Sequence, residues 1–244
     1  MPFHLANHRQ SAYPLQPRTS HCLRKNPVDT QFARNQMVSQ QVRAWNVLDV
    51  RVLAIFEALP RDQFVPARYR KLAFADTQVS LPHAQMMMTP KMEGRLLQAL
   101  DPHPEESVLE IGTGSGFLSA CLAKMAGEVL SVDIFPDFTT TAGKTLADLG
   151  IHTVQLETRD GTKLDGFTQR FDVIAVTGSL PVYDKMYAER LNIGGRLFVI
   201  VGESPVMEAL LITRVAEDTW TRESLFETDL PALLNAARPR HFRF

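Results

Sequence analysis

Cysteine is nearly absent from the 244-residue chain, which contains only Cys22 and Cys121. Two cysteines exclude a disulfide-rich secreted scaffold and a four-cysteine zinc site, and we expect no metal centre. No apolar run approaches the ~20 residues that a helix needs to cross a bilayer. The first residues also lack the continuous apolar stretch of a secretory signal. The sequence therefore predicts a cytoplasmic protein without a membrane partner.

A large excess of charge of either sign is also missing. The chain has 26 lysines and arginines against 27 aspartates and glutamates, and its net charge is −1. This balance gives no general attraction to nucleic acid, so we expect no nucleic-acid partner. Hydrophobic residues make up 45% of the chain, which is enough to bury the core of one domain of this length.

Residues 1–28 contain four cationic residues, four prolines and no acidic residue. They show no helical or strand period, and such a composition cannot bury enough apolar surface to offset its loss of conformational entropy. We predict a disordered basic arm. The alternatives are a targeting peptide, which the prolines oppose, or an extended start before a functional unit that begins at Met37. A chain that starts at Met37 is expected to keep its stability.

Residues 29–244 are predicted to form a single domain that opens with helices and a loop in residues 29–100. Apolar residues at helical spacing predict the helices, one of them capped by Asp49. Residues 76–90 show no clean period and are predicted to be a loop. A further helix is expected at residues 91–100.

Strand and helix signals alternate between residues 105 and 230. Apolar runs predict strands at residues 107–111, 128–134, 153–156, 171–177 and 196–201, and two adjacent final strands at 209–215 and 221–227. This order indicates an α/β fold with a doubly wound, mostly parallel sheet and an antiparallel pair at one edge. The basic and aromatic tail, residues 231–244, is predicted to be a solvated end or an intermolecular contact.

The strongest functional signal is a buried strand that runs into three alternating glycines and then directly into a helix. Its residues are Val108-Leu109-Glu110-Ile111-Gly112-Thr113-Gly114-Ser115-Gly116-Phe117. Glycine allows unusual dihedrals and a close approach of the backbone to a ligand, and a helix N-terminus offers free N–H donors. Asp133 ends the next predicted strand, where a carboxylate can accept both ribose hydroxyls of a nucleoside.

Two ligands compete for this glycine loop. A dinucleotide usually requires the spacing G-x-G-x-x-G, with its pyrophosphate on the helix terminus. Here the spacing is G-x-G-x-G, and the preceding acid, Glu110, suits an ammonium group better than two phosphates. S-adenosyl-L-methionine (SAM) has an ammonium group, a ribose and no phosphate, and it is the cofactor that we predict. The expected cofactor-binding residues are Glu110, Gly112, Thr113, Gly114, Gly116 and Asp133.

A second candidate contact to the cofactor follows the third predicted strand. Asp160 could accept a hydrogen bond from the adenine amino group, and Gly161 would let the chain pass close to the ring. The alternative is an ordinary Asp-Gly turn. Beside the glycine loop, we favour the adenine contact.

These residues resemble the protein-L-isoaspartate O-methyltransferase family from about Met37 to Gly202. The matching stretches, besides the glycine loop, are Met37-Val38, Gln41, Asp49–Leu53, Pro60–Pro66, Phe171–Thr177, Leu191, Gly194–Leu197 and Val201-Gly202. The resemblance implies a Rossmann-like class I SAM-dependent methyltransferase. It also implies methyl transfer to the α-carboxylate of isoaspartyl residues in proteins or peptides, as a step of protein repair.

One stretch departs from the family pattern. The family carries Gly-Gln-Thr-Ile-Ser-x-Pro in its substrate loop, whereas this chain has Ala84-Gln85-Met86-Met87-Met88-Thr89-Pro90. Two methionines therefore replace the family's hydroxyl residues. Thr89, the nearest remaining hydroxyl, is the candidate catalytic residue, and the candidate substrate-loop residues are His83, Gln85, Met86 and Met88.

The methionines leave the acceptor open. Methionine is flexible and polarizable, so the three side chains either fill a gap in the fold or line an apolar pocket for a different acceptor. A SAM-binding protein without catalysis is a further alternative.

Overall fold

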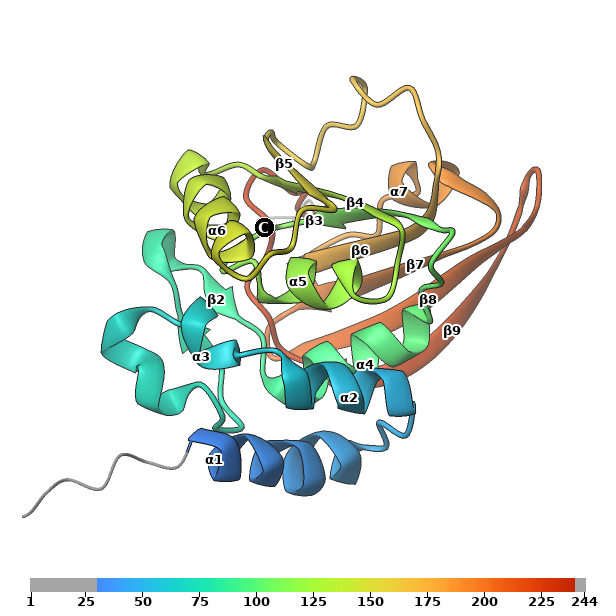
Figure 1. Ribbon diagram of the computed structural model, residues 1–244. Coiled ribbons are helices and arrows are strands. Elements are labelled where there is room, and N and C mark those ends of the chain that lie inside the picture. The colour runs from blue at the N-terminus through green and yellow to red at the C-terminus, as the bar shows by residue number, and fades with distance from the viewer. Residues whose placement is uncertain (1–29, 240–244) are drawn as a thin grey trace, which may run out of the picture.

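The computed structural model describes residues 30–239 and is built around a seven-stranded sheet with the order β5-β4-β3-β6-β7-β8-β9 (Figure 1). β3 to β7 pair in parallel, and β8 and β9 continue the sheet as antiparallel strands. The predicted mostly parallel sheet with an antiparallel edge is confirmed. The strands are β3 (Ser107–Ile111), β4 (Glu128–Asp133), β5 (Val154–Thr158), β6 (Phe171–Leu180), β7 (Leu191–Glu203), β8 (Val206–Ala216) and β9 (Thr219–Thr228).

The order of the strands reverses at β3. The chain steps outward from β3 to β4 and β5, and then returns to place β6 and β7 on the other side of β3. In open α/β sheets, ligands bind outside the carboxyl ends of the strands at such a switch point. The carboxyl ends of β3, β4 and β6 are therefore the expected position of the site.

Apolar clusters cover both faces of the sheet, because side chains alternate along each strand. Val108 of β3 belongs to one cluster, whereas Leu109 and Ile111 belong to the other. The first cluster contains residues of α4 (Pro90–Leu100), α5 (Phe117–Ala123), α6 (Pro136–Asp148) and the helices that precede them; α7 (Met186–Glu189) belongs to the second. The first cluster thus packs the N-terminal helices against the sheet, and a single domain in residues 29–244 stays a prediction.

The N-terminal region is helical, as expected. Asp49 caps α2, because its carboxylate accepts a hydrogen bond of 2.8 Å from the backbone N–H of Arg51. The elements before the sheet are α1 (Thr30–Met37), the π-helical turn η1 (Val38–Val42), the 3-10 turn η2 (Arg43–Trp45), α2 (Val50–Ala58), α3 (Arg61–Phe64) and the 3-10 turn η3 (Ala67–Leu72). None of the helices in residues 30–239 has the length and apolar character that a bilayer crossing requires.

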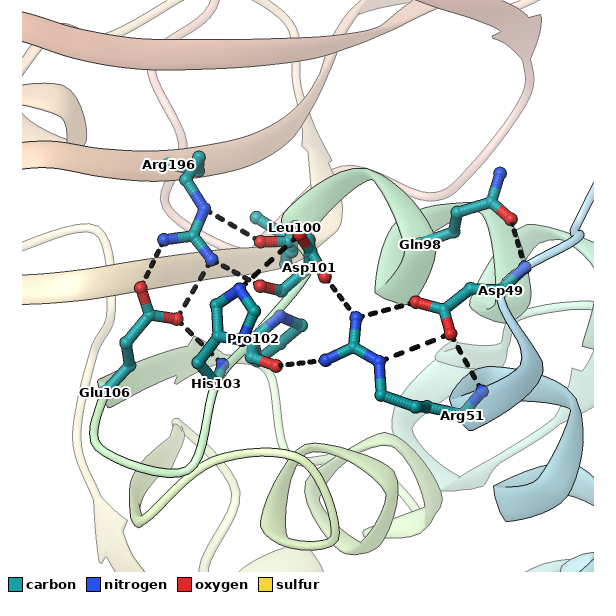
Figure 2. Close-up of polar contacts among 9 residues, drawn as sticks. All are labelled: Asp49, Arg51, Gln98, Leu100, Asp101, Pro102, His103, Glu106 and Arg196. Carbon is teal, nitrogen blue, oxygen red and sulfur yellow. Dashed lines mark hydrogen bonds and ion pairs between the residues drawn. The ribbon is translucent and has the colours of Figure 1, made fainter.

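A polar cluster joins α2, the C-terminal end of α4 and β7 (Figure 2). Arg51 binds the carboxylates of Asp49 and Asp101, and Arg196 binds the carboxylate of Glu106. Both arginines also donate to backbone carbonyl oxygens at or just beyond the end of α4, at distances of 2.6 to 3.2 Å. These bonds supply partners for carbonyl groups near a helix end, where intrahelical donors run out.

Residues 76–90 are not a plain loop, and this expectation was wrong. They contain a small antiparallel hairpin, β1 (Val79–Ser80) and β2 (Met86–Met87), joined by the 3-10 turn η4 (Pro82–Ala84). Val79 pairs with Met87, and Ser80 pairs with Met86. Two-residue strands are too short to show an alternating pattern in the sequence.

The expected basic arm, residues 1–28, lies outside the described residues. Met37, however, ends α1 and does not begin the folded unit. Arg34 of α1 donates to the carbonyl oxygen of Glu57 at 3.2 Å and forms an ion pair with Asp62 at 3.7 Å. Met37 itself is fully buried. A chain that begins at Met37 therefore loses packed structure.

We predict that a chain starting at Thr30 keeps the melting temperature of the full-length protein, because the sequence predicts a dispensable arm. A chain starting at Met37 should melt roughly 5 °C lower, since a loss of 1–2 kcal/mol has about that effect at this size. Thermal unfolding followed by circular dichroism measures both. Equal melting temperatures for the two truncated chains would show that α1 contributes nothing to stability.

Candidate active site

A cavity lies at the carboxyl ends of β3, β4 and β6, where the strand order reverses. The hairpin, the glycine loop, residues 159–162 and the segment 230–234 surround it. Most of the residues expected from the sequence line this cavity: Gln85, Met86, Met88, Glu110, Gly112, Thr113, Gly114, Asp133, Asp160 and Gly161. The fold thus brings the predicted cofactor loop and the predicted substrate loop to one space.

The glycine loop has the backbone that its sequence predicts. Gly112, Gly114 and Gly116 have φ angles of +101°, +50° and +82°, in the left-handed region that favours glycine. A Cβ atom at Gly112 would lie 2.3 Å from the hydroxyl oxygen of Thr177. That hydroxyl, on β6, donates to the carbonyl oxygen of Gly112 at 2.7 Å. Gly116 does not line the cavity; it provides the left-handed turn that starts α5.

Asp133 holds the glycine loop in place. Its Oδ2 accepts a hydrogen bond of 2.8 Å from the backbone N–H of Gly114, and its Oδ1 accepts one of 3.0 Å from Phe135. The side chain is largely buried and lines the cavity. Each carboxylate oxygen can accept more than one hydrogen bond. Asp133 can therefore bind ribose hydroxyls while it keeps the loop closed.

Glu110 is a buried acid with one satisfied oxygen. Its Oε2 accepts hydrogen bonds from the hydroxyl of Ser119 on α5 and from that of Ser131 on β4, the latter at 2.5 Å. Its Oε1 is buried and has no hydrogen-bond partner. Burial raises the pKa of Glu110 to about 7, against the effect of the two serines. A buried acceptor without a donor, in a residue that lines the cavity, fits the ammonium group of SAM.

Asp160 and Gly161 form the local turn that was one of the two interpretations made from the sequence, and they also lie at the cavity. Asp160 lines the cavity, yet its Oδ1 accepts from the backbone N–H of Thr162 at 3.0 Å, which is the local turn. Its Oδ2 accepts from the side-chain amide of Asn235 at 3.0 Å. A Cβ atom at Gly161 would lie 2.4 Å from a methyl carbon of Ile111, so the lack of a side chain lets the chain pass close to β3. The adenine contact of Asp160 stays a prediction.

The three methionines of the hairpin differ in how deeply they are buried. Met87 and Met88 are each only 5% exposed and belong to the apolar core, whereas Met86 is half-buried at the cavity. The gap-filling interpretation therefore holds for Met87 and Met88, and a pocket for a different acceptor stays a prediction. Met87 and Met88 pack in the core, and all three methionines line the cavity as an apolar wall.

The structure does not bring Thr89 or His83 to the cavity. Thr89 is the N-cap residue of α4, and its hydroxyl is buried without a hydrogen-bond partner. The imidazole of His83 lies 3.0 Å from the carboxylate of Asp137 and stacks on Phe135 at 3.9 Å. His83 thus fastens the hairpin to α6, and the geometry does not support a catalytic role for Thr89.

Residues 230–234, after β9, form a wall of the site, which corrects the prediction of a solvated end for this part of the tail. Ser179 on β6 exchanges backbone hydrogen bonds of 3.0 and 2.9 Å with Pro231 and Leu233. Leu230, Pro231, Leu233 and Leu234 line the cavity. The apolar Leu230-Pro231-Ala232-Leu233-Leu234 run was the available signal for this wall, because a solvated tail rarely has one.

The buried carboxyl of Glu110 gives a pH prediction for the free protein. Its pKa is about 7 in the folded state against an ordinary 4.5, so the folded state binds more protons between these values and stability falls as pH rises. Glu110→Gln should therefore stabilise the protein more at pH 8 than at pH 5, by on the order of 2–3 kcal/mol. Urea unfolding at both pH values measures this. Asp148→Asn, on the exposed surface of α6, is the control. An effect of Glu110→Gln that does not change with pH would contradict the raised pKa of Glu110.

Asp133 gives a binding prediction. Asp133→Ala should weaken SAM binding by about 1–3 kcal/mol, because it removes an acceptor for the ribose and the anchor of the Gly114 N–H. Calorimetric titration with SAM measures the effect, and Asp148→Ala should leave the affinity unchanged. An unaltered affinity in the Asp133 variant would remove this residue from the cofactor site.

Comparisons with known proteins place the chain in a family. The model of the family "Protein-L-isoaspartate(D-aspartate) O-methyltransferase (PCMT)" matches residues 33–228. Protein-L-isoaspartate O-methyltransferase 1 of Rhodopseudomonas palustris (strain HaA2) is 35% identical over 208 residues, which cover 84% of this chain and 85% of the relative. The protein-L-isoaspartate O-methyltransferase of Aeropyrum pernix is 36% identical over 197 residues, 78% of this chain and 75% of the relative.

Solved structures agree with the fold. A putative protein-L-isoaspartate O-methyltransferase of Plasmodium falciparum, in complex with S-adenosyl-L-homocysteine, superposes with a TM-score of 0.70 at 18% identity, over 84% of this chain and 97% of that one. Another protein-L-isoaspartate O-methyltransferase gives 0.67 at 20% identity, over 82% and 65%. On the family match and the identities of the relatives, the chain is a methyltransferase that belongs to the protein-L-isoaspartate(D-aspartate) O-methyltransferase family.

Proposed function

We propose that this enzyme transfers a methyl group from SAM to the α-carboxylate of isoaspartyl residues in proteins and peptides, as a step of protein repair. The observation that carries the proposal is one cavity lined both by the glycine loop and by the hairpin at the position of the family's substrate loop. Donor and acceptor can therefore meet in a single space.

Three carboxyl residues of this chain would hold the cofactor. Glu110 offers its unpaired oxygen to the ammonium group, and Asp133 offers acceptors to the ribose. Asp160, beside Gly161, lies where the adenine is expected. SAM supplies, when bound, a methyl group on a positively charged sulfonium.

The reaction does not require a strong base in the site. A carboxylate acceptor has an ordinary pKa near 4 and is already ionised at neutral pH. His83, in the turn of the hairpin, faces Asp137 and not the cavity. This agrees with a reaction that depends on the placement of the reactants and not on a base. Holding the two reactants in line can lower the activation free energy of the transfer by roughly 7–11 kcal/mol.

The charge of the cavity favours one order of binding. Among the described residues, its lining contains four carboxyl groups and one cation, Arg159. Glu93 is paired with Arg61, so Asp133, Asp160 and the ionised fraction of Glu110 supply the negative charge. A positively charged donor is attracted to this set, whereas a carboxylate acceptor is repelled. The acceptor should therefore bind after the cofactor has neutralised part of this charge.

A different acceptor is the second candidate, and Met86 is the observation that favours it. The family has a hydroxyl residue at this position, and here the half-buried side chain faces the cavity without a hydrogen-bond donor. A substrate whose methyl-accepting group is flanked by apolar groups would pack against that wall. The lack of a nucleic-acid partner, supported by the net charge of −1, and the cytoplasmic location stay predictions.

The test is methyl transfer from labelled SAM to an isoaspartyl peptide, with the matching aspartyl peptide as control. Base-labile label should appear on the isoaspartyl peptide alone. Met86→Thr should raise kcat/KM about tenfold, which corresponds to about 1.4 kcal/mol, the scale of one recovered hydrogen bond. Met86→Leu is the matched control and should gain nothing.

Met86 is the position to change because Met88 is in the core, and a smaller residue there would leave a destabilising cavity. The affinity for SAM should stay constant in both Met86 variants. Binding of SAM without transfer to the isoaspartyl peptide would reject the proposed acceptor. A transfer rate that Met86→Thr leaves unchanged would show that the missing hydroxyl does not limit activity.

A further inference from the structure

Arg61 is a charged residue with no exposed surface, and it binds three separate segments. Its Nε and Nη2 donate to the two carboxylate oxygens of Glu93 at 3.1 and 3.2 Å. Its Nη1 donates to the carbonyl oxygen of Ala73 at 2.6 Å, and its Nη2 also donates to that of Met88 at 2.7 Å. One side chain of α3 thus joins the segment after η3, the end of the hairpin and the start of α4.

The same guanidinium contacts the cofactor side of the molecule. It lies over the ring of Phe117 at 5.2 Å, and Phe117 is the first residue of the helix that follows the glycine loop. Phe56 and Phe64 pack edge-on against this ring at 5.6 and 5.5 Å. Arg61 is therefore in contact with both the hairpin and the base of the cofactor loop.

Glu93 extends the arrangement into the cavity. It is 2% exposed, it belongs to the first turn of α4, and it lines the cavity together with Met86 and Met88. The burial of this ion pair is costly, and well-packed apolar residues of similar volume are often at least as stabilising. The pair therefore calls for a role other than stability.

We infer that Arg61 and Glu93 are a positioning pair, which fixes the backbone of Met88 and with it the Met86–Met88 wall relative to the cofactor loop. The inference rests on the proposed methyl transfer, in which the acceptor carboxylate must lie in line with the transferred methyl group. The pair has no contact with the reacting atoms; it sets where the acceptor is held. A displacement of about 1 Å at such a wall is enough to cost roughly a hundredfold in rate.

The sharpest variant replaces the pair by apolar residues, Arg61→Met with Glu93→Leu. The structure offers a matched control in Arg196 and Glu106, which repeat the same chemistry far from the cavity. Arg196 also binds a carboxylate and two backbone carbonyl oxygens, those of Leu100 and Asp101 (Figure 2). Arg196→Met with Glu106→Leu therefore removes equivalent bonds without touching the hairpin. Arg61→Lys, which keeps the charge, serves if the double variant does not fold.

The readouts are kcat/KM for the isoaspartyl peptide, the Kd for SAM, and spectra of protein labelled with ¹³C-methyl methionine. In the Arg61 and Glu93 variants we expect kcat/KM to fall roughly 10- to 100-fold while the Kd for SAM changes less than about threefold. The methyl signals of Met86, Met87 and Met88 should shift or broaden. The control pair should alter only the melting temperature.

Two outcomes overturn the inference. In the first, a folded Arg61 and Glu93 variant keeps its kcat/KM and its methionine spectra. In the second, kcat/KM and SAM affinity fall in parallel, which places the pair in the cofactor site. If the wild-type protein transfers no methyl group to the isoaspartyl peptide, the proposed function fails, and the methionine spectra still decide whether the pair holds the hairpin.

Discussion

The carboxyl group of Glu110, buried under the glycine loop, is the charge around which the site is arranged. It comes from the central strand β3, and hydroxyls from α5 and β4 satisfy one of its oxygens, so three neighbouring elements meet on it. The other oxygen has no donor, and burial raises the pKa of the group to about 7, so a large share of it is protonated near neutral pH. A cation that enters the cavity changes this balance, because a nearby positive charge favours the ionised acid. The free protein thus gives up stability for affinity toward a positively charged ligand.

The remaining architecture places this carboxyl in the lining of the cavity. The reversal of strand order at β3 opens a crevice, the left-handed glycines turn the backbone along it, and Asp133 fixes the loop. Two segments that are not part of the parallel sheet then complete the walls. The hairpin is fastened to α6 through His83, and the segment after β9 is fastened to Ser179. The cofactor side is built by the sheet, and the acceptor side by these additions.

Elements with a long or repeated pattern could be predicted from the sequence. The apolar strands, the antiparallel edge, the Asp49 cap and the three glycines each rest on local chemistry, and the structure places them as expected. The acceptor side could not be predicted in the same way. The hairpin strands are two residues long, and the wall at 230–234 depends on bonds to a strand fifty residues away. Thr89 is the nearest hydroxyl in the sequence, but the turn into α4 buries it.

The buried Glu110 is expected to bind the ammonium group of SAM. The number of protons released on binding tests this expectation directly. At pH 6.5, an acid with a pKa of about 7 is mostly protonated, and pairing with an ammonium group lowers that pKa. Calorimetric titration of SAM in two buffers with different ionisation enthalpies counts the protons. We expect the wild-type protein to release about half a proton or more, and Glu110→Gln to release clearly fewer. Binding of SAM to the wild-type protein with no release of protons would contradict the account.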